Sequence, residues 1–232
     1  ADLREIYLAA LRCLANQDLA GRRVLVTLGP TREFWDGVRF LSNPSTGIMG
    51  AALAVAAWLR GAKVTAICGP GVPWLPQDIE RVDVVSAREM LVAGEEYFPA
   101  ADYACFCAAV ADFRPAVSSG AKLKKTELGD APELPLMANP DVLATLAARK
   151  SAEQRIIAFA AESGDLERNA RAKLERKKAD MLVGNLVNQP DSGFGDGNNT
   201  VQIWDCKGGH EQLPPLPKAE VAWRVWDWCA RR

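Results

Sequence analysis

Five short segments that carry hydroxyl, amide, carboxylate or glycine residues lie where predicted strands end or a predicted helix begins. They are residues 29–33, 42–50, 108–112, 139–142 and 159–162. Ligands of an open α/β sheet bind outside the carboxyl ends of its strands, so these segments are expected to line one site. Segment 42–50 offers hydroxyls, an amide and two glycines at a helix start, where backbone N–H groups can bind an anion. Taken alone, this segment fits a capped helix start equally well.

Charged side chains elsewhere could serve the same site, although each also has a simpler interpretation. Residues 122–125 contain three lysines, and such a run is most often a solvated surface. Lys173 and Lys177 are four residues apart and share one helix face, which is also typical of a solvated surface. Asp112 follows an apolar strand as a lone carboxylate and is a modest candidate for a cation or ribose contact. His210, the only histidine, lies in a glycine-rich hairpin and has little claim to catalysis.

Alternating strand and helix patterns along the chain must position these segments. Hydrophobic periodicity and turn residues predict strands at 24–28, 64–68, 103–108, 156–160 and 181–184, helices at 2–17, 50–60, 87–97, 140–150, 166–178 and 219–230, and an edge hairpin of 200–205 with 211–213. This alternation predicts a Rossmann-like three-layer α/β fold with a mainly parallel sheet and an antiparallel C-terminal hairpin. Residues 113–138 are expected to be irregular. We expect one domain over 1–232, with an N-terminal helix or connector at 1–21 and a nucleotide-binding core at 22–232.

The composition limits the classes of partner and the compartment. Lys and Arg number 28 against 29 Asp and Glu, for a net charge of −1, which argues against a broad nucleic-acid or membrane surface. The six cysteines form no Cys-x-x-Cys pair or zinc ligand set and indicate free thiols in a reducing compartment. We find no signal peptide and no apolar run of about 18 residues. The expected location is the cytoplasm.

The segments, taken together, resemble the bacterial phosphopantothenate–cysteine ligase family. The matching pieces are 24–27, 29–33, 39–43, 47–50, 108–112, 122–125, 139–141, 159–162 and 173–180, in family order over roughly residues 5–205. In many bacteria this ligase is the C-terminal half of a bifunctional coenzyme A biosynthesis protein. The resemblance implies that a flavin-dependent decarboxylase precedes this chain and that residues 2–23 join the two halves.

The resemblance also implies a reaction in two steps. CTP activates the carboxylate of 4′-phosphopantothenate as an acyl-cytidylate and pyrophosphate leaves. The amine of L-cysteine then displaces CMP. A triphosphate calls for lysines, backbone N–H groups and Mg²⁺, with Asp112 as the nearby protein carboxylate. Family members are generally homodimers.

Site residues follow from the resemblance position by position. The nucleotide-binding set is Ala108, Ala109, Asp112, Lys122, Asn139, Pro140, Asp141, Val142, Phe159, Lys173 and Lys177. Asn43 and Lys122 are the expected catalytic residues, and Asn43, Ser45 and Gly47 are expected to bind the acyl substrate. The Asn43 amide can donate to oxygens on which charge develops.

Two departures and three alternatives accompany this interpretation. Ile48 and Ala138 stand where the family commonly has basic residues, which removes positive charge near the expected phosphate site. A non-catalytic regulatory derivative of the ligase is one alternative. An NAD(P)-dependent Rossmann oxidoreductase is another, although no Gly-x-Gly-x-x-Gly follows the first strand and Gly69-Pro70 replaces an acidic residue after the second. ATP in place of CTP is the third.

Overall fold

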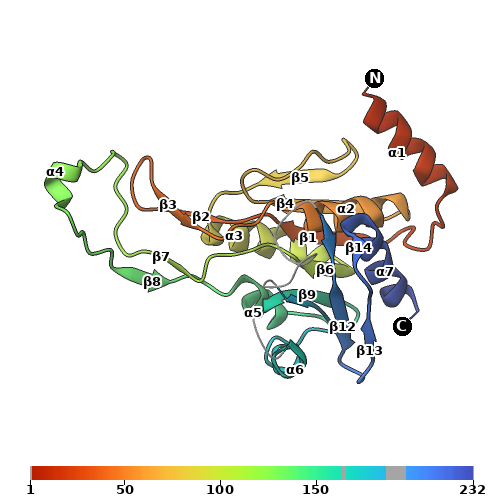
Figure 1. Cartoon of the computed structure of the whole chain (residues 1–232). Coiled ribbons are helices and arrows are strands. Elements are labelled where there is room, and N and C mark those ends of the chain that lie inside the picture. Colours follow the sequence, from red (N-terminus) through yellow and green to blue (C-terminus); the bar gives the residue numbers. More distant parts are fainter. Residues whose placement is uncertain (1, 163–165, 187–196, 232) are drawn as a thin grey trace.

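An eight-stranded sheet forms the centre of the computed structural model, which describes residues 2–162, 166–186 and 197–231 (Figure 1). Its strands are β1 (Arg23–Leu28), β4 (Lys63–Cys68), β5 (Glu80–Asp83), β6 (Tyr103–Phe106), β9 (Arg155–Glu162), β10 (Met181–Leu186), β12 (Val201–Asp205) and β13 (His210–Gln212). The order is β13-β12-β10-β9-β6-β1-β4-β5. The six strands from β10 to β5 are parallel, while β12 runs antiparallel to both neighbours. The predicted fold class and the edge hairpin are confirmed.

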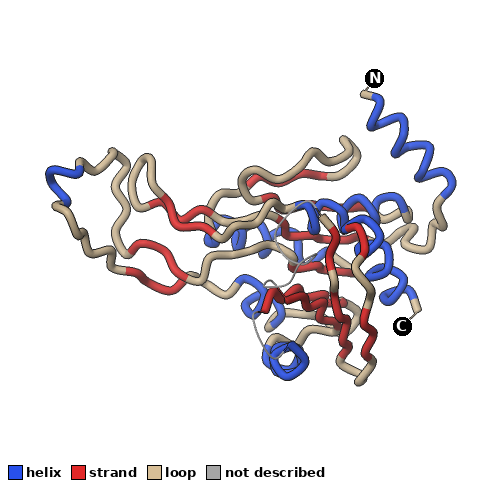
Figure 2. Tube along the Cα trace, in the orientation of Figure 1, coloured by secondary structure: helices blue, strands red, loops and turns tan. Residues whose placement is uncertain are grey.

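Helices cover both faces of the sheet and bury an apolar core on each (Figure 2). One face carries α2 (Ile48–Leu59) and α7 (Lys218–Ala230), which pack on each other. The alanine-rich α2 is buried along most of its length because it lies between β1 and α7. The other face carries α3 (Ala87–Tyr97), η1 (Phe98–Ala100), α5 (Val142–Ala147) and α6 (Leu166–Arg176).

Several predicted boundaries are wrong for local reasons. The helix predicted at 140–150 begins at Val142, because Asp141 is its N-cap and accepts from the Ala144 amide at 2.9 Å. Strand β5 was not predicted, since its residues are charged or mostly exposed and only backbone pairing with β4 defines it. The N-terminal helix α1 (Leu3–Leu14) is shorter than expected and buries none of its residues fully.

A long arm projects from the sheet and was not predicted (Figure 1). It contains the hairpin of β2 (Arg32–Phe34) with β3 (Phe40–Ser42), the antiparallel pair of β7 (Phe113–Pro115) with β8 (Leu136–Ala138), and α4 (Lys125–Leu128) at its far end. Residues 113–138 were expected to be irregular, but their three-residue strands are too short to give a periodic pattern. A further small ladder pairs β11 (Asn198–Asn199) with β14 (Leu216–Pro217). None of the helices in the described ranges has the length and apolar character of a membrane span.

Candidate active site

A cleft of about 680 Å³ opens at the carboxyl ends of β1, β6 and β9. Strands β1 and β6 lie side by side where the strand order reverses, because β1 continues to β4 on one side and β6 to β9 on the other. Such a switch point is where doubly wound sheets bind ligands. Every predicted site residue except Lys122 lines this cleft: Asn43, Ser45, Gly47, Ala108, Ala109, Asp112, Asn139, Pro140, Asp141, Val142, Phe159, Lys173 and Lys177.

One wall of the cleft is the turn between β3 and α2. Gly47 precedes α2 with φ of +72°, and an added Cβ would lie 2.7 Å from Val72 Cγ1, so only glycine fits there. Among the residues that the structure describes, no side chain caps the first turn of α2, whose N–H groups can therefore bind an anion. Ile48, the first helical residue, contributes no charge, so backbone groups would have to bind an anion at this point.

The opposite wall is the segment 108–112, which follows β6. The buried Thr31 hydroxyl accepts from the Ala111 amide at 3.0 Å. The Asn139 side-chain amide donates to the Ala111 carbonyl oxygen at 2.8 Å, and the Asn139 backbone N–H donates to Asp112 O at 2.8 Å. These bonds fix the main chain of a narrow slot. Thr31 was missed as a supporting residue, although a threonine in the turn after the first strand could have indicated it.

Asn43 joins the two walls. Its side-chain nitrogen donates to the carbonyl oxygen of Val110 at 3.0 Å and more distantly to that of Ala109 at 3.4 Å. The preceding Ser42 hydroxyl donates to the Thr31 carbonyl oxygen at 2.7 Å. Asn43 is therefore held by the same segment that forms the slot.

Basic side chains approach the cleft from α6 and from the start of α7. Arg176 and Lys218 line the cleft beside the predicted Lys173 and Lys177. Sequence reasoning missed both, although Arg176 lies three residues after Lys173 and hence on the same helix face. Lys177 forms an ion pair with Asp141. Burial lowers the pKa of Lys177, and the nearby negative charge of Asp112 opposes that shift.

Asn185 and Asn199 also line the cleft, and nothing in the sequence pattern pointed to them. Asp112 is exposed at the cleft. Among the described residues no three His, Cys, Asp or Glu side chains gather in a metal-binding group. A lone carboxylate suits Mg²⁺ that keeps several waters and is bound mainly by phosphate oxygens.

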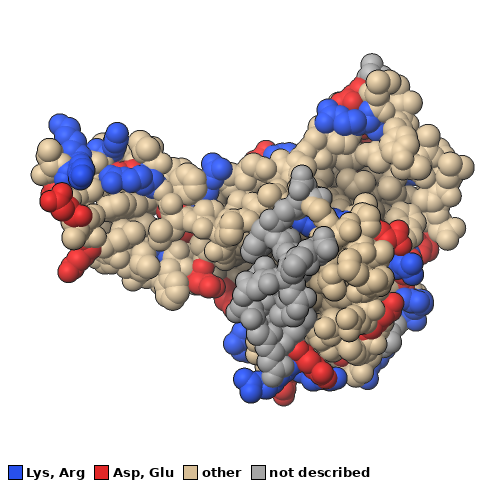
Figure 3. Space-filling model, in the orientation of Figure 1, with Lys and Arg blue, Asp and Glu red and all other residues tan. Residues whose placement is uncertain are grey.

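Lys122 lies apart from the cleft. It is exposed in the segment that precedes α4, at the far end of the arm, and it does not line the cleft of its own chain. Basic side chains gather at this far end and again near α6 (Figure 3). The tertiary structure of one chain thus assembles the predicted site without its expected catalytic lysine.

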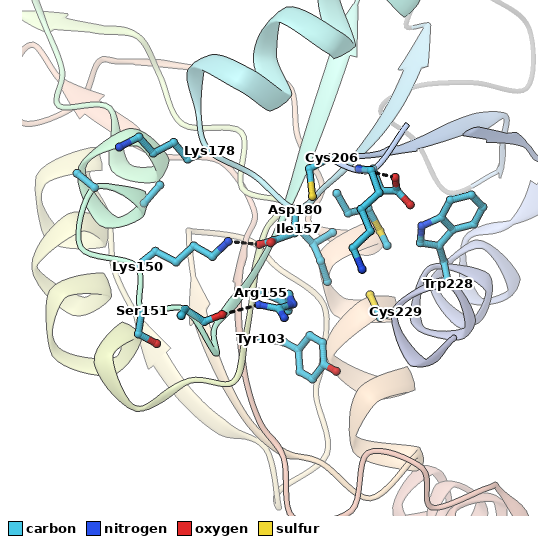
Figure 4. A pocket seen from close by; sticks show the side chains of 16 residues that line it. Tyr103, Lys150, Ser151, Arg155, Ile157, Lys178, Asp180, Cys206, Trp228 and Cys229 are labelled. Carbon is cyan, nitrogen blue, oxygen red and sulfur yellow. Dashed lines mark hydrogen bonds and ion pairs between the residues drawn. The ribbon is translucent and has the colours of Figure 1, made fainter. Parts of the chain in front are cut away.

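A second cavity of about 640 Å³ lies at the amino ends of β6, β9 and β10 (Figure 4). Its lining includes an ion pair of 2.6 Å between Lys150 Nζ and Asp180 Oδ2. Asp180 also accepts from the Ile156 amide, and Arg155 donates to the Ala152 carbonyl oxygen at 2.8 Å. These charged groups are engaged within the fold. None of the predicted site residues lines this cavity, which leaves the cleft at the carboxyl ends as the candidate active site.

The doubly wound sheet, with a cleft at its switch point and a helix N-terminus in that cleft, defines a Rossmann-like α/β protein. Residues 19–232 match the family model described as the DNA/pantothenate metabolism flavoprotein C-terminal domain, and the chain belongs to this family. The predicted family is thereby confirmed.

Relatives and solved structures agree with this assignment. The chain is 39% identical over 207 residues to the coenzyme A biosynthesis bifunctional protein CoaBC of Vibrio vulnificus. The aligned region covers 89% of this chain and 51% of that protein. The chain thus spans about half the length of the curated relatives it matches. The crystal structure of the C-terminal domain of a CoaBC protein is 34% identical, with a TM-score of 0.79 over 93% of this chain and 97% of that one. A Cab2 mutant in complex with phosphopantothenate-cysteine shares the fold at a TM-score of 0.70 and 17% identity, covering 98% of this chain and 92% of that one.

Proposed function

We propose that this chain is a ligase of coenzyme A biosynthesis that joins 4′-phosphopantothenate to L-cysteine. The observation that carries the proposal is the cleft at the switch point, where the fold gathers thirteen residues of the family's expected site. The CoaBC relatives are named for coenzyme A biosynthesis, and a neighbour of the same fold holds phosphopantothenate-cysteine. Both support the same substrate class.

We propose CTP as the activating nucleotide. The base would lie in the slot formed by 108–111 and 139–142, against Phe159. The phosphates would face the uncapped start of α2 and the cations Lys173 and Lys177. Mg²⁺ held near Asp112 would neutralise phosphate charge.

The reaction would proceed in two steps, in which pyrophosphate and then CMP are displaced. A carboxylate oxygen of 4′-phosphopantothenate attacks the α-phosphorus of CTP, and the P–O bond to pyrophosphate breaks. The cysteine amine then attacks the acyl carbon, the bond to CMP breaks, and the amine loses a proton. Asn43 lies beside the slot, where its amide can orient the acyl phosphate and stabilise the developing oxyanion.

A homodimer would explain the position of Lys122. The arm exposes large apolar side chains, which a lone chain would leave in water: Phe34, Val38, Phe40, Phe113, Val117, Leu136 and Met137. We propose that two arms pair through these side chains and that Lys122 acts in the cleft of the second copy. Fusion to a decarboxylase half is proposed from the CoaBC relatives, and the free thiols agree with the reducing cytoplasm.

Pyrophosphate release tests the function directly. The chain is incubated with each of the four NTPs and Mg²⁺, with and without 4′-phosphopantothenate and L-cysteine. We expect release with CTP that requires 4′-phosphopantothenate and not cysteine, and a ligated product only when cysteine is present. Absence of release with every nucleotide would instead favour the non-catalytic derivative, and release with ATP alone would reassign the nucleotide.

A further inference from the structure

A fully buried carboxylate lies at the turn of the β2–β3 hairpin, within the arm. The side chain of Asp36 has an exposed fraction of 0%. Its Oδ1 accepts from the backbone amides of Val38 at 2.8 Å and Arg39 at 2.7 Å, and its Oδ2 accepts from Arg39 Nε at 2.9 Å. These bonds, first of all those from Arg39, hold the pKa of the Asp36 carboxyl well below its usual range.

The same carboxylate reaches across the arm to the lysine-containing segment. Asp36 Oδ2 accepts from the backbone N–H of Leu123 at 3.1 Å. Arg39 Nη2 donates to the carbonyl oxygen of Leu123 at 2.8 Å, while the guanidinium lies over the Trp35 ring at 4.4 Å. The Asp36–Arg39 pair therefore binds both polar backbone groups of a residue 84 or more positions away in sequence.

Two neighbouring contacts extend this attachment. The backbone N–H of Ser119 donates to the Trp35 carbonyl oxygen at 2.9 Å. Gly37 lies so close to Gly120 that an added Cβ would be 2.7 Å from the Gly120 oxygen. The backbone of residues 119–123 thus packs against the β2–β3 hairpin, whereas the side chains of Lys122 and Lys124, on either side of Leu123, are exposed.

We propose that Asp36 is a positioning residue for Lys122. With Arg39 it fixes the backbone of Leu123 from both sides and so sets where the adjacent Lys122 side chain leaves the arm. A lysine on an irregular loop would otherwise lose backbone and rotamer entropy each time it engaged a nucleotide. This inference rests on the proposed function, in which Lys122 assists acyl-cytidylate formation.

The test is a double-mutant cycle in the 232-residue chain. Asp36→Asn keeps the shape but replaces one acceptor oxygen with an NH₂ group, which cannot serve both Leu123 N–H and Arg39. We expect kcat for CTP-dependent pyrophosphate release to fall roughly 10- to 100-fold, with little change in KM for CTP, because misplacement of a catalytic group has this scale of cost. In the Lys122→Gln background the same substitution should add less than about twofold, since coupled residues are not additive.

The matched control is Asp130→Asn, which removes an exposed carboxylate from the same arm and should leave kcat unchanged. Hydrogen exchange supplies a readout apart from activity: the Leu123 amide should exchange faster in Asp36→Asn, while amides of β1 keep their protection. A kcat for Asp36→Asn equal to that of the parent chain would overturn this inference and leave the proposed function standing. The same holds if the loss in the double variant equals the product of the losses in the two single variants. A wild-type chain that releases no pyrophosphate would overturn the proposed function, and the inference with it.

Discussion

The amide nitrogen of Asn43 donates to the carbonyl oxygen of Val110 at 3.0 Å, across a sequence separation of 67 residues. This bond joins the turn before α2 to the segment after β6. The turn expected to bind the acyl substrate and the segment expected to bind the nucleotide are therefore parts of one hydrogen-bonded unit.

Asn43→Asp should separate the two half-reactions. The aspartate is nearly isosteric, but it cannot donate to Val110 and places negative charge beside the expected acyl phosphate. We expect pyrophosphate release to persist while ligated product falls by about 10²-fold, the scale of losing one oxyanion donor. Quenched single-turnover assays that follow both products would measure this split.

Asn198→Asp serves as the control, because Asn198 is exposed and does not line the cleft. It should match the parent chain in both products. Formation of ligated product by Asn43→Asp at the parent rate would contradict a catalytic role for Asn43 and leave it only a structural contact between the two walls.

Thr31→Val should destabilise the segment 108–112, which forms one wall of the cleft. Thr31 is fully buried and its hydroxyl is the acceptor for the Ala111 amide. Valine has a similar volume but leaves that buried N–H without this acceptor, at a cost of about 1–3 kcal/mol in the free energy of unfolding. Urea denaturation should report this loss, and CTP affinity should fall with it. Thr31→Ser keeps the hydroxyl, so equal CTP affinities in the two variants would contradict the role given to this bond.

CTP with Mg²⁺ should raise the melting temperature more than ATP, GTP or UTP does. A ligand that binds only the native state stabilises it by about 2.7 kcal/mol at a concentration of 100 times Kd. Chelation of Mg²⁺ should reduce the shift, because the metal would no longer offset the repulsion between the phosphates and the Asp112 carboxylate. Equal increases in melting temperature for all four nucleotides would contradict the assignment of CTP.

Mixed dimers should show whether Lys122 acts in the second copy. Lys122→Gln and Asn43→Asp chains would each be deficient in ligation, but a heterodimer would contain one cleft with both residues intact. Random mixing in equal amounts should restore about a quarter of the parent activity, since half the dimers are mixed and each has one complete site. Mixtures no more active than the separate variants would contradict the proposed action of Lys122 in the second copy.

Thiol labelling should distinguish exposed from buried cysteines. Burial raises the pKa of Cys107 and of Cys229 to about 12 and that of Cys68 to about 11, so almost no thiolate is present at pH 8. Iodoacetamide should therefore modify the exposed Cys13 and Cys206 in the native chain, and all six cysteines after denaturation. The pKa values of Cys107 and Cys229 in the folded chain exceed the unfolded value of 9.0. The contribution of these two thiols to the free energy of unfolding is therefore fully present below about pH 9 and is lost as the pH rises towards 12. Fast native labelling of Cys107 would contradict the raised pKa of its thiol.

Local patterns in the sequence determined the layered core and most of the site. The apolar runs of β1 and β4 and the alanine-rich α2 each fit one type of element, so the hydrophobic pattern and the turn residues identified them. The carboxyl ends of parallel strands meet at one edge, which is why segments such as 108–112 and 159–162 could be expected to come together.

The tertiary structure alone decided the arm, the supporting contacts and the place of Lys122. Strands β2, β3, β7 and β8 have only three residues each, so backbone pairing rather than local propensity defines them. Thr31 and Asp36 act through hydrogen bonds to residues about 80 positions away, which no local pattern records. Sequence spacing can align Lys122 with a family position, but the direction of a side chain on a long connection depends on the backbone contacts that hold it.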